Sequence, residues 1–341
     1  MRRPIFLFGF PRSGTTLVRA VLGRHSRISL VNEPELIWAL RRSGVGIDDR
    51  IAPSELPALI ERLRRTRLCR DHLARSALRV QELLAAHHAL SFRGLFEHLL
   101  PRPVDATLIW GEQSLNDLFY TRDLAALYPD CLLIHIVRDP RAVARSRAEK
   151  RSATSAREPA ATLRSAWSHA NDARLWRDWM AIAREAERTL RGARWFELRN
   201  EEFLAQPVRV LQSLCAAIGV EYEEGMLDPA GRAADPVLQT QAAFAHGRIS
   251  QPLDPQRAAA ARGEPAALAW IVEREAGLAM RSLGYEPTKP ELPGWQARAL
   301  SLLCVASGHW RRRQHRAHFA QRGVAAAELN VLRSALATSR G

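Results

Sequence analysis

A strand pattern, a glycine-containing loop and a helical pattern follow one another at the start of this 341-residue chain. The run IFLFG (5–9) has no polar residue, which is typical of a strand buried on both faces of a parallel sheet. The loop GFPRSGTT (9–16) leads from it into the helical pattern TTLVRAVLGRH. A strand joined in this way to a helix begins a βαβ unit, so the chain is expected to adopt an α/β fold.

Three more strand patterns support this fold class. They are TLIWG (107–111), CLLIHIVR (131–138) and RWFELR (194–199), and helical patterns lie between and after them. The longest helical pattern is amphipathic and carries tryptophans at helical spacing, in LRSAWSHANDARLWRDWMAIAREAERTL (163–190). Strands that alternate with helices predict a doubly wound, P-loop-type fold of three layers with a parallel central sheet.

The remaining segments predict two additions to this fold. Residues 41–100 are rich in Arg and Leu and predict a helical insertion between the first two of these strands, where it would form a lid beside the binding site. A connector, TKPELPGW, leads to a helical, basic tail with WRRRQHRAHFAQR at its centre. We therefore expect one α/β domain over 1–290 and a basic helical extension over 291–341.

The net charge of +14 comes almost entirely from arginine, since lysine occurs only at Lys150 and Lys289. Such an excess favours an anionic partner: phosphate, nucleic acid or a membrane surface. The four cysteines are scattered without a CxxC pair, which indicates reduced thiols in a cytoplasmic protein. The apolar run in MRRPIFLFGF is too short for a secretory signal, and no window reaches eighteen apolar residues, so no membrane-spanning helix is expected.

The loop GFPRSGTT has the glycine spacing of a phosphate-binding Walker A loop, but Thr15 stands where that loop has its lysine. Its geometry still suits an anion, because its backbone amides meet the positive end of the next helix. The hydroxyls of Ser13, Thr15 and Thr16 add donors, and Arg12 adds a fixed charge. The missing lysine argues against Mg²⁺-dependent triphosphate hydrolysis, and a loop whose glycines only permit tight packing is the structural alternative.

A second candidate anion site lies in VRDPRAVARS (137–146). Arg138 ends a predicted buried strand, where open α/β sheets bind ligands. Asp139 can cap the following helix and Pro140 suits its first turn. Ser146 follows eight residues after Arg138, so the two side chains together could grip a phosphate. The structural alternative is that the sequence Arg-Asp-Pro (138–140) only caps the helix and binds no phosphate.

The two motifs together resemble the sulfotransferases that use 3′-phosphoadenosine 5′-phosphosulfate (PAPS), of the bacterial type related to the tyrosylprotein branch. The resemblance spans roughly residues 4–285 and includes LRNEEFLAQPVRVLQSLCAAIGVEY (198–222) and LGYEP (283–287). It implies transfer without a metal ion and release of 3′-phosphoadenosine 5′-phosphate (PAP). It also implies two sets of cofactor contacts: Arg12, Ser13, Gly14, Thr15 and Thr16 for the phosphosulfate, and Arg138 and Ser146 for the 3′-phosphate.

Two positions depart from this family pattern. Where many members read WGEKTP, this chain reads WGEQSL, so Gln113 replaces a lysine that would stabilise the leaving phosphate. Its loss shifts that task to Arg12. Asn200 stands where the family often has an aromatic residue near the adenine.

Glu33 is the candidate general base. It lies in VNEPEL, 21 residues after Arg12, and is expected at the start of a short helix with Pro34 in the first position. The family resemblance implies that a glutamate at this spacing takes the acceptor's proton, for which partial burial would have to raise its pKa. Helix capping by Glu33 or Glu35 is the alternative.

Four histidines are candidates for two roles. His25 and His135 are other candidates for the base, although His135 stands in a predicted core strand. His315 and His318 have the spacing of a helical metal pair, but no cysteine or carboxylate cluster stands near them in the sequence. No metal is therefore expected to be required.

The sequence thus predicts sulfuryl transfer from PAPS to a hydroxyl group of a small molecule, carbohydrate or lipid, with Glu33 and Arg12 as the catalytic residues. A non-catalytic PAP- or nucleotide-binding protein and a P-loop kinase or NTPase are the alternatives. The WRRRQHR run could bind nucleic acid or anionic lipid, or form a solvated helix face. Nucleic acid is not expected as a partner, and the formation of homo-oligomers is left open by the sequence. We expect a cytoplasmic protein, and peripheral membrane contact through the tail (297–341) stays open.

Overall fold

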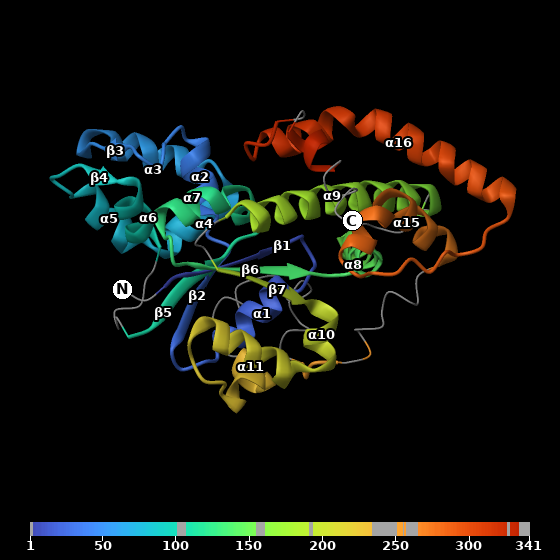
Figure 1. The fold of residues 1–341 in the computed structure, drawn as a ribbon. Helices are drawn as coiled ribbons and strands as arrows, with labels where there is room; N and C mark the ends of the chain where they lie inside the picture. Colours follow the sequence, from blue (N-terminus) through green and yellow to red (C-terminus); the bar gives the residue numbers. More distant parts are fainter. Residues whose placement is uncertain are drawn as a thin grey trace.

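A five-stranded parallel sheet forms the centre of the molecule (Figure 1). The computed structural model describes residues 3–100, 107–154, 161–190, 194–233, 251–254, 256, 265–325 and 328–333. The strand order is β2-β5-β1-β6-β7, so β1 is the central strand. The strands span Ile5–Gly9 (β1), Ile28–Asn32 (β2), Ile109–Gln113 (β5), Leu132–Val137 (β6) and Arg194–Arg199 (β7).

The alternation of side chains along β1 divides the core into two layers. Ile5 and Leu7 pack with the helices on one face of the sheet, while Phe6 and Phe8 pack with those on the other face. The first set includes α1 (Thr15–Leu22), α10 (Asn200–Ala205) and α11 (Pro207–Ile218). The second includes α8 (Pro140–Thr154), α9 (Ala161–Thr189), α15 (Ala266–Ser282) and α16 (Gly294–Ala320), together with the helices between residues 36 and 127. The predicted three-layer α/β fold is therefore confirmed.

Two strand predictions need correction. The structure contains a strand, β2, that the sequence reading missed, because ISLVN alternates between buried and half-buried residues at the sheet edge and lacks a continuous apolar run. Strand β5 runs from Ile109 to Gln113 and not from 107 to 111. Glu112 and Gln113, which lie beyond the predicted end of this strand, are therefore fully buried strand residues.

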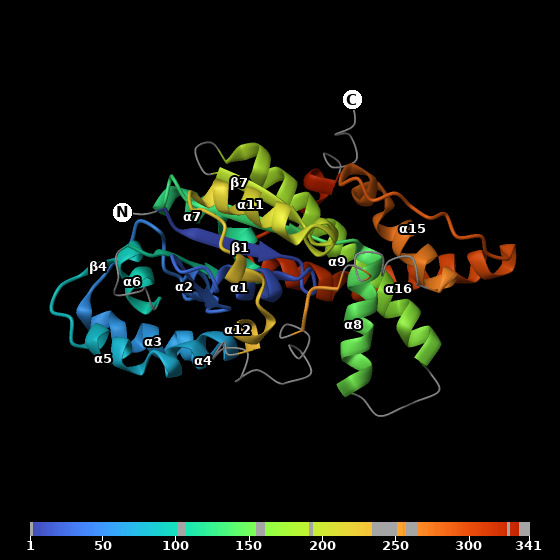
Figure 2. The same ribbon diagram turned by 90° about the horizontal axis from the view of Figure 1, so that it is seen from below.

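The insertion over 41–100 lies between β2 and β5 and is mainly helical. After α2 (Leu36–Arg42) it contains α3 (Leu56–Arg64), α4 (Arg67–Arg75), α5 (Ala77–Leu84) and α6 (Phe92–Leu99). It also contains a small antiparallel pair, β3 (Arg50–Ile51) and β4 (Leu90–Ser91), which the sequence did not predict. Figures 1 and 2 both show the insertion gathered at the end of the molecule opposite α15.

After residue 290 the chain forms the helix α16, which packs on α9. The guanidinium of Arg174 on α9 donates to the carbonyl oxygen of Cys304 on α16 at 2.6 Å. Arg333 then donates to both carboxylate oxygens of the fully buried Asp178, at 2.6 and 2.5 Å. Among the described residues, no helix is long and apolar enough to cross a membrane, and the four cysteines are free and buried.

Candidate functional site

The predicted site residues come together because each follows the carboxyl end of a parallel strand. The loop 10–16 follows β1, Glu33 follows β2, Ser114 follows β5, Arg138 follows β6 and Asn200 follows β7. Parallel strands end at the same edge of the sheet, and ligands of open α/β sheets bind at this edge. The five segments therefore border one site.

The turn of the β1–α1 loop depends on residues with left-handed backbone conformations. Arg12 has a φ of 76° and Gly14 a φ of 100°, and the amide of Ser13 donates to the carbonyl of Phe10 at 3.0 Å. A Cβ atom on Gly14 would lie 2.3 Å from Nδ2 of Asn200. Gly14 thus serves both the turn and the close approach of Asn200, the residue that departs from the aromatic one of the family pattern.

The loop presents unsatisfied donors, as an anion site requires. Helix α1 begins at Thr15, its N-cap residue Gly14 makes no side-chain cap, and its first turn contains no acidic residue. The amides of the first turn therefore donate no hydrogen bond to an N-cap side chain, and they lie at the positive end of the helix dipole. The hydroxyl of Ser13 is fully buried and has no hydrogen-bond partner. These groups suit a bound phosphate or sulfate.

Arg138 and Ser146, predicted as a second site, lie directly against the first. Nη1 of Arg138 donates to the backbone oxygen of Arg12 at 2.9 Å, and Nε of Arg12 donates to Oγ of Ser146 at 3.1 Å. Burial lowers the pKa of Arg138, and the nearby charges of Glu201 and Arg12 act in opposite directions on it. Two guanidinium groups therefore share one small region, where a bound anion would offset their repulsion.

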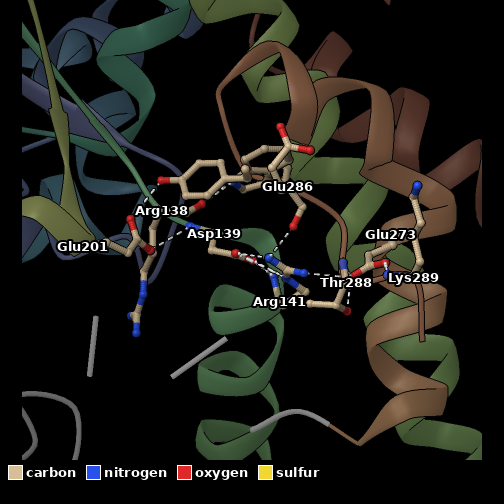
Figure 3. Close-up of polar contacts among 10 residues, drawn as sticks. Arg138, Asp139, Arg141, Glu201, Glu273, Glu286, Thr288 and Lys289 are labelled. Carbon is tan, nitrogen blue, oxygen red and sulfur yellow. Dashed lines mark hydrogen bonds and ion pairs between the residues drawn. The ribbon is translucent and has the colours of Figure 1, made fainter. Parts of the chain in front are cut away.

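A network of buried charges holds the start of α8 in place (Figure 3). Asp139 caps α8 as predicted, since its carboxylate accepts from the amide of Arg141 at 2.8 Å. The guanidinium of Arg141 pairs with Asp139 at 2.7 Å and with Glu273 of α15 at 2.7 Å. The side chain of Arg138 extends away from this network in Figure 3. The network therefore fixes the backbone from which Arg138 projects.

We expect Arg141→Ala to lower the free energy of unfolding by about 3 kcal/mol, because Asp139 and Glu273 would stay buried without their cation. The exposed fractions of the side chains are 7% for Arg141, 5% for Asp139 and 8% for Glu273. Urea unfolding measures the change. Arg145→Ala is the control: its pair with Glu149 is 45% exposed on both sides, and its loss should cost at most about 1 kcal/mol. Equal losses in both variants would contradict a structural role for the network.

Glu33 lies at the site edge, but its predicted place in a helix is wrong. Helix α2 begins at Leu36, and both Glu33 and Glu35 adopt left-handed conformations, with φ of 45° and 52°. The amide of Glu33 donates to the carbonyl of Gln113 at 2.7 Å, which fixes the turn after β2. Glu35 is the N-cap residue of α2 but makes no side-chain cap. Left-handed conformations of non-glycine residues are costly and concentrate at functional sites.

Burial raises the pKa of the Glu33 carboxyl group. The side chain of Gln113 and the charges of Lys150 and Arg19 offset part of this rise. Gln113 itself is fully buried, and its two amide atoms make no hydrogen bond of ordinary length. The position predicted to carry a family lysine therefore lies beside the candidate base, with unused hydrogen-bonding capacity.

A cluster of buried carboxyl groups next to Glu33 was not predicted. Burial raises the pKa of Glu35 to about 7 and of Glu112 to about 8, and it raises the pKa of Asp117 well above its ordinary value. Asn116 donates to Glu35 at 2.7 Å and accepts from Arg322, just beyond α16, at 2.6 Å. In the described part of the chain, no group of three His, Cys, Asp or Glu side chains is suited to a metal ion. No spacing rule could have found this cluster, because three separate segments form it.

Aromatic side chains from three segments form a wall beside the loop. Trp179 of α9 packs against Phe10 of the loop at 5.4 Å and against Phe119 at 4.8 Å between ring centroids. Phe119 in turn contacts Phe319 of α16 at 6.1 Å. Arg147 of α8 stacks over Phe10 at 5.4 Å. The C-terminal helix α16 thus packs against aromatic side chains that in turn contact the loop.

The fold and the site define an α/β protein with contiguous anion-binding groups at the carboxyl edge of a parallel sheet. A family model described as "Sulfotransferase family" matches residues 4–224. The match covers more than half of the chain, so the chain belongs to the sulfotransferase family.

Solved structures show the same fold in two bacterial biosynthetic enzymes. The sulfotransferase domain of the Synechococcus PCC 7002 olefin synthase is 20% identical, with a TM-score of 0.56 over 86% of this chain and 98% of that domain. The sulfotransferase domain from the curacin biosynthetic pathway is 20% identical, with a TM-score of 0.51 over 86% and 99%. No curated protein sequence matches this chain. At these identities the structures support the fold alone.

Proposed function

We propose that the protein transfers a sulfuryl group from PAPS to a hydroxyl group of an acceptor. The observation that carries this proposal is the contact of Arg12 with both Ser146 and Arg138 beside a loop with unsatisfied donors. Triphosphate chemistry is less well supported, because Thr15 stands at the Walker lysine position and Arg138 follows the strand where an acidic residue would be needed.

The proposed cofactor contacts follow the chemistry of the donors. PAPS would supply the sulfuryl group and would leave as PAP. The amides and hydroxyls of Ser13, Gly14, Thr15 and Thr16 would hold the phosphosulfate, since they surround the positive end of α1. Arg138 and Ser146 would hold the 3′-phosphate by charge-assisted hydrogen bonds, each favourable by about 1.5–3 kcal/mol.

Glu33 and Arg12 are the proposed catalytic residues. Glu33 would accept the proton of the attacking hydroxyl group, and its raised pKa strengthens it as a base near neutral pH. Arg12 would stabilise the charge that develops on the leaving phosphate, a task that Gln113 can support only as a neutral hydrogen-bond donor. No step of this proposal requires a metal ion.

A PAP-binding protein without transfer activity is the second candidate. Gln113 favours it, because the neutral amide replaces a lysine of the family pattern beside Glu33. The free, buried cysteines support a cytoplasmic location for either function.

Calorimetry with PAP and transfer from labelled PAPS test the proposal. We expect PAP binding and label transfer to at least one phenolic, carbohydrate or lipid hydroxyl, with equal rates in EDTA and in Mg²⁺. PAP binding without transfer to any acceptor of the panel would favour the second candidate. Mg²⁺-dependent ATP turnover without PAP binding would overturn both.

A further inference from the structure

Helix α16 exposes large apolar side chains along one face. The exposed fractions are 74% for Trp295, 72% for Leu302 and 52% for Val305. On the opposite face Cys304 and Ser307 are buried against the domain. Figure 1 shows α16 as the outermost helix on its side of the sheet. Tryptophan and leucine side chains so exposed on one face of a helix indicate a surface that contacts a membrane or another molecule.

Basic residues share this face with the apolar ones. Arg298, His309 and Arg316 are exposed, and at 100° per residue they fall with the three apolar residues within an arc of about 80°. The face extends over about 30 Å of the helix. The six residues Trp295, Arg298, Leu302, Val305, His309 and Arg316 are called the α16 face below.

The whole helix lacks negative charge. Its 27 residues contain five arginines and no aspartate or glutamate. An apolar stripe with arginines and a tryptophan is the pattern of a helix that lies in the interface of an anionic bilayer. Arg298 and Arg316 would attract acidic headgroups, while Trp295 and Leu302 would enter the boundary of the acyl chains.

Other partners fit this face less well. A second copy of the chain also carries a net charge of +14, so pairing two α16 faces would oppose arginine to arginine. A nucleic acid would neutralise the arginines but would leave Leu302 and Val305 without an apolar environment. Only an anionic lipid surface satisfies both kinds of side chain.

We propose that the α16 face binds the surface of membranes that contain anionic lipids. The exposed tryptophan, leucine and valine on an arginine-bearing helix without acidic residues carry this inference. It is independent of the proposed transfer reaction, because the six residues of the α16 face include none of the proposed catalytic or cofactor residues.

Co-sedimentation of the full chain with vesicles tests the proposal. We expect binding to vesicles of phosphatidylglycerol and phosphatidylcholine, and binding at least about tenfold weaker to phosphatidylcholine alone. The double variant Leu302→Glu/Val305→Glu should lose at least tenfold in binding to the anionic vesicles. Val208→Glu is the matched control, since Val208 is 43% exposed on α11, on the other side of the sheet.

The controls separate lipid binding from misfolding and from self-association. PAP binding by the double variant should equal that of the wild type, which shows that the domain is folded. Equal vesicle binding by the double variant and the wild type would overturn the proposal. Light scattering tests for self-association. If the wild type forms a dimer and binds no vesicles, and the double variant is a monomer, the α16 face would instead bind a second copy of the chain. Binding to a DNA duplex but not to vesicles would overturn it as well.

Discussion

Glu33→Gln is expected to lower sulfuryl transfer by about 10²–10⁴-fold while the affinity for PAP stays unchanged. Glutamine keeps the size and the hydrogen-bonding atoms of the side chain but cannot take up the acceptor's proton. The turn should persist, because the backbone amide of Glu33, and not its side chain, donates to Gln113. Single-turnover transfer from labelled PAPS and calorimetry with PAP measure the two quantities.

Glu35→Gln is the matched control for this variant. Glu35 lies two residues further in the same left-handed turn, and its pKa of about 7 means that much of it is already protonated at neutral pH. Its replacement should therefore change transfer by less than about tenfold. If Glu35→Gln removes transfer and Glu33→Gln does not, the base is Glu35.

The pH dependence of transfer adds a second readout. The pKa of Glu33 is raised, so its carboxylate form, which acts as the base, is lost as the pH falls through a value above the ordinary glutamate range. We expect an acidic limb at this pH in the rate of the wild type. The residual activity of Glu33→Gln should not show this fall in rate at acidic pH. If the fall is unchanged by the substitution, it belongs to the titration of another side chain.

The sequence predicted those parts of the site that depend on local order. A strand, a glycine loop and a helix in succession fix where Ser13 and Thr15 lie, because the loop must turn at the sheet edge whatever surrounds it. The same holds for Arg138, which follows the strand β6, and for Asp139, which caps the helix α8. These residues lie where the motifs placed them.

The other parts of the site depend on contacts between distant segments. Glu33 was expected in a helix because Pro34 suits a first helical position, but the chain turns through left-handed conformations and begins α2 only at Leu36. The hydrogen bond between the backbone of Glu33 and Gln113 holds this turn, and it requires the pairing of β2 with β5. Local propensity carries no information about such a pairing.

Arg138→Gln is expected to weaken PAP binding by about 10²–10³-fold, because a half-buried guanidinium can form charge-assisted hydrogen bonds with a phosphate and glutamine cannot. Nη1 of Arg138 also holds the backbone of Arg12, so part of the loss would come through the loop. Calorimetry with PAP measures the affinity. Arg145→Gln, on the exposed side of α8, should leave it unchanged.

A comparison of the affinities for PAP and for AMP separates direct contacts of Arg138 with the 3′-phosphate from its effect through the loop. AMP lacks the 3′-phosphate, so the ratio of the two affinities reports contacts to that group alone. Arg138→Gln and Ser146→Ala should both reduce this ratio, because the two residues are proposed to bind the 3′-phosphate. Arg12→Ala should weaken both ligands and change the ratio less, since Arg12 lies in the loop proposed to hold the 5′-phosphosulfate. A ratio that Arg138→Gln leaves at the wild-type value would place the 3′-phosphate elsewhere and would restrict Arg138 to its contact with the loop.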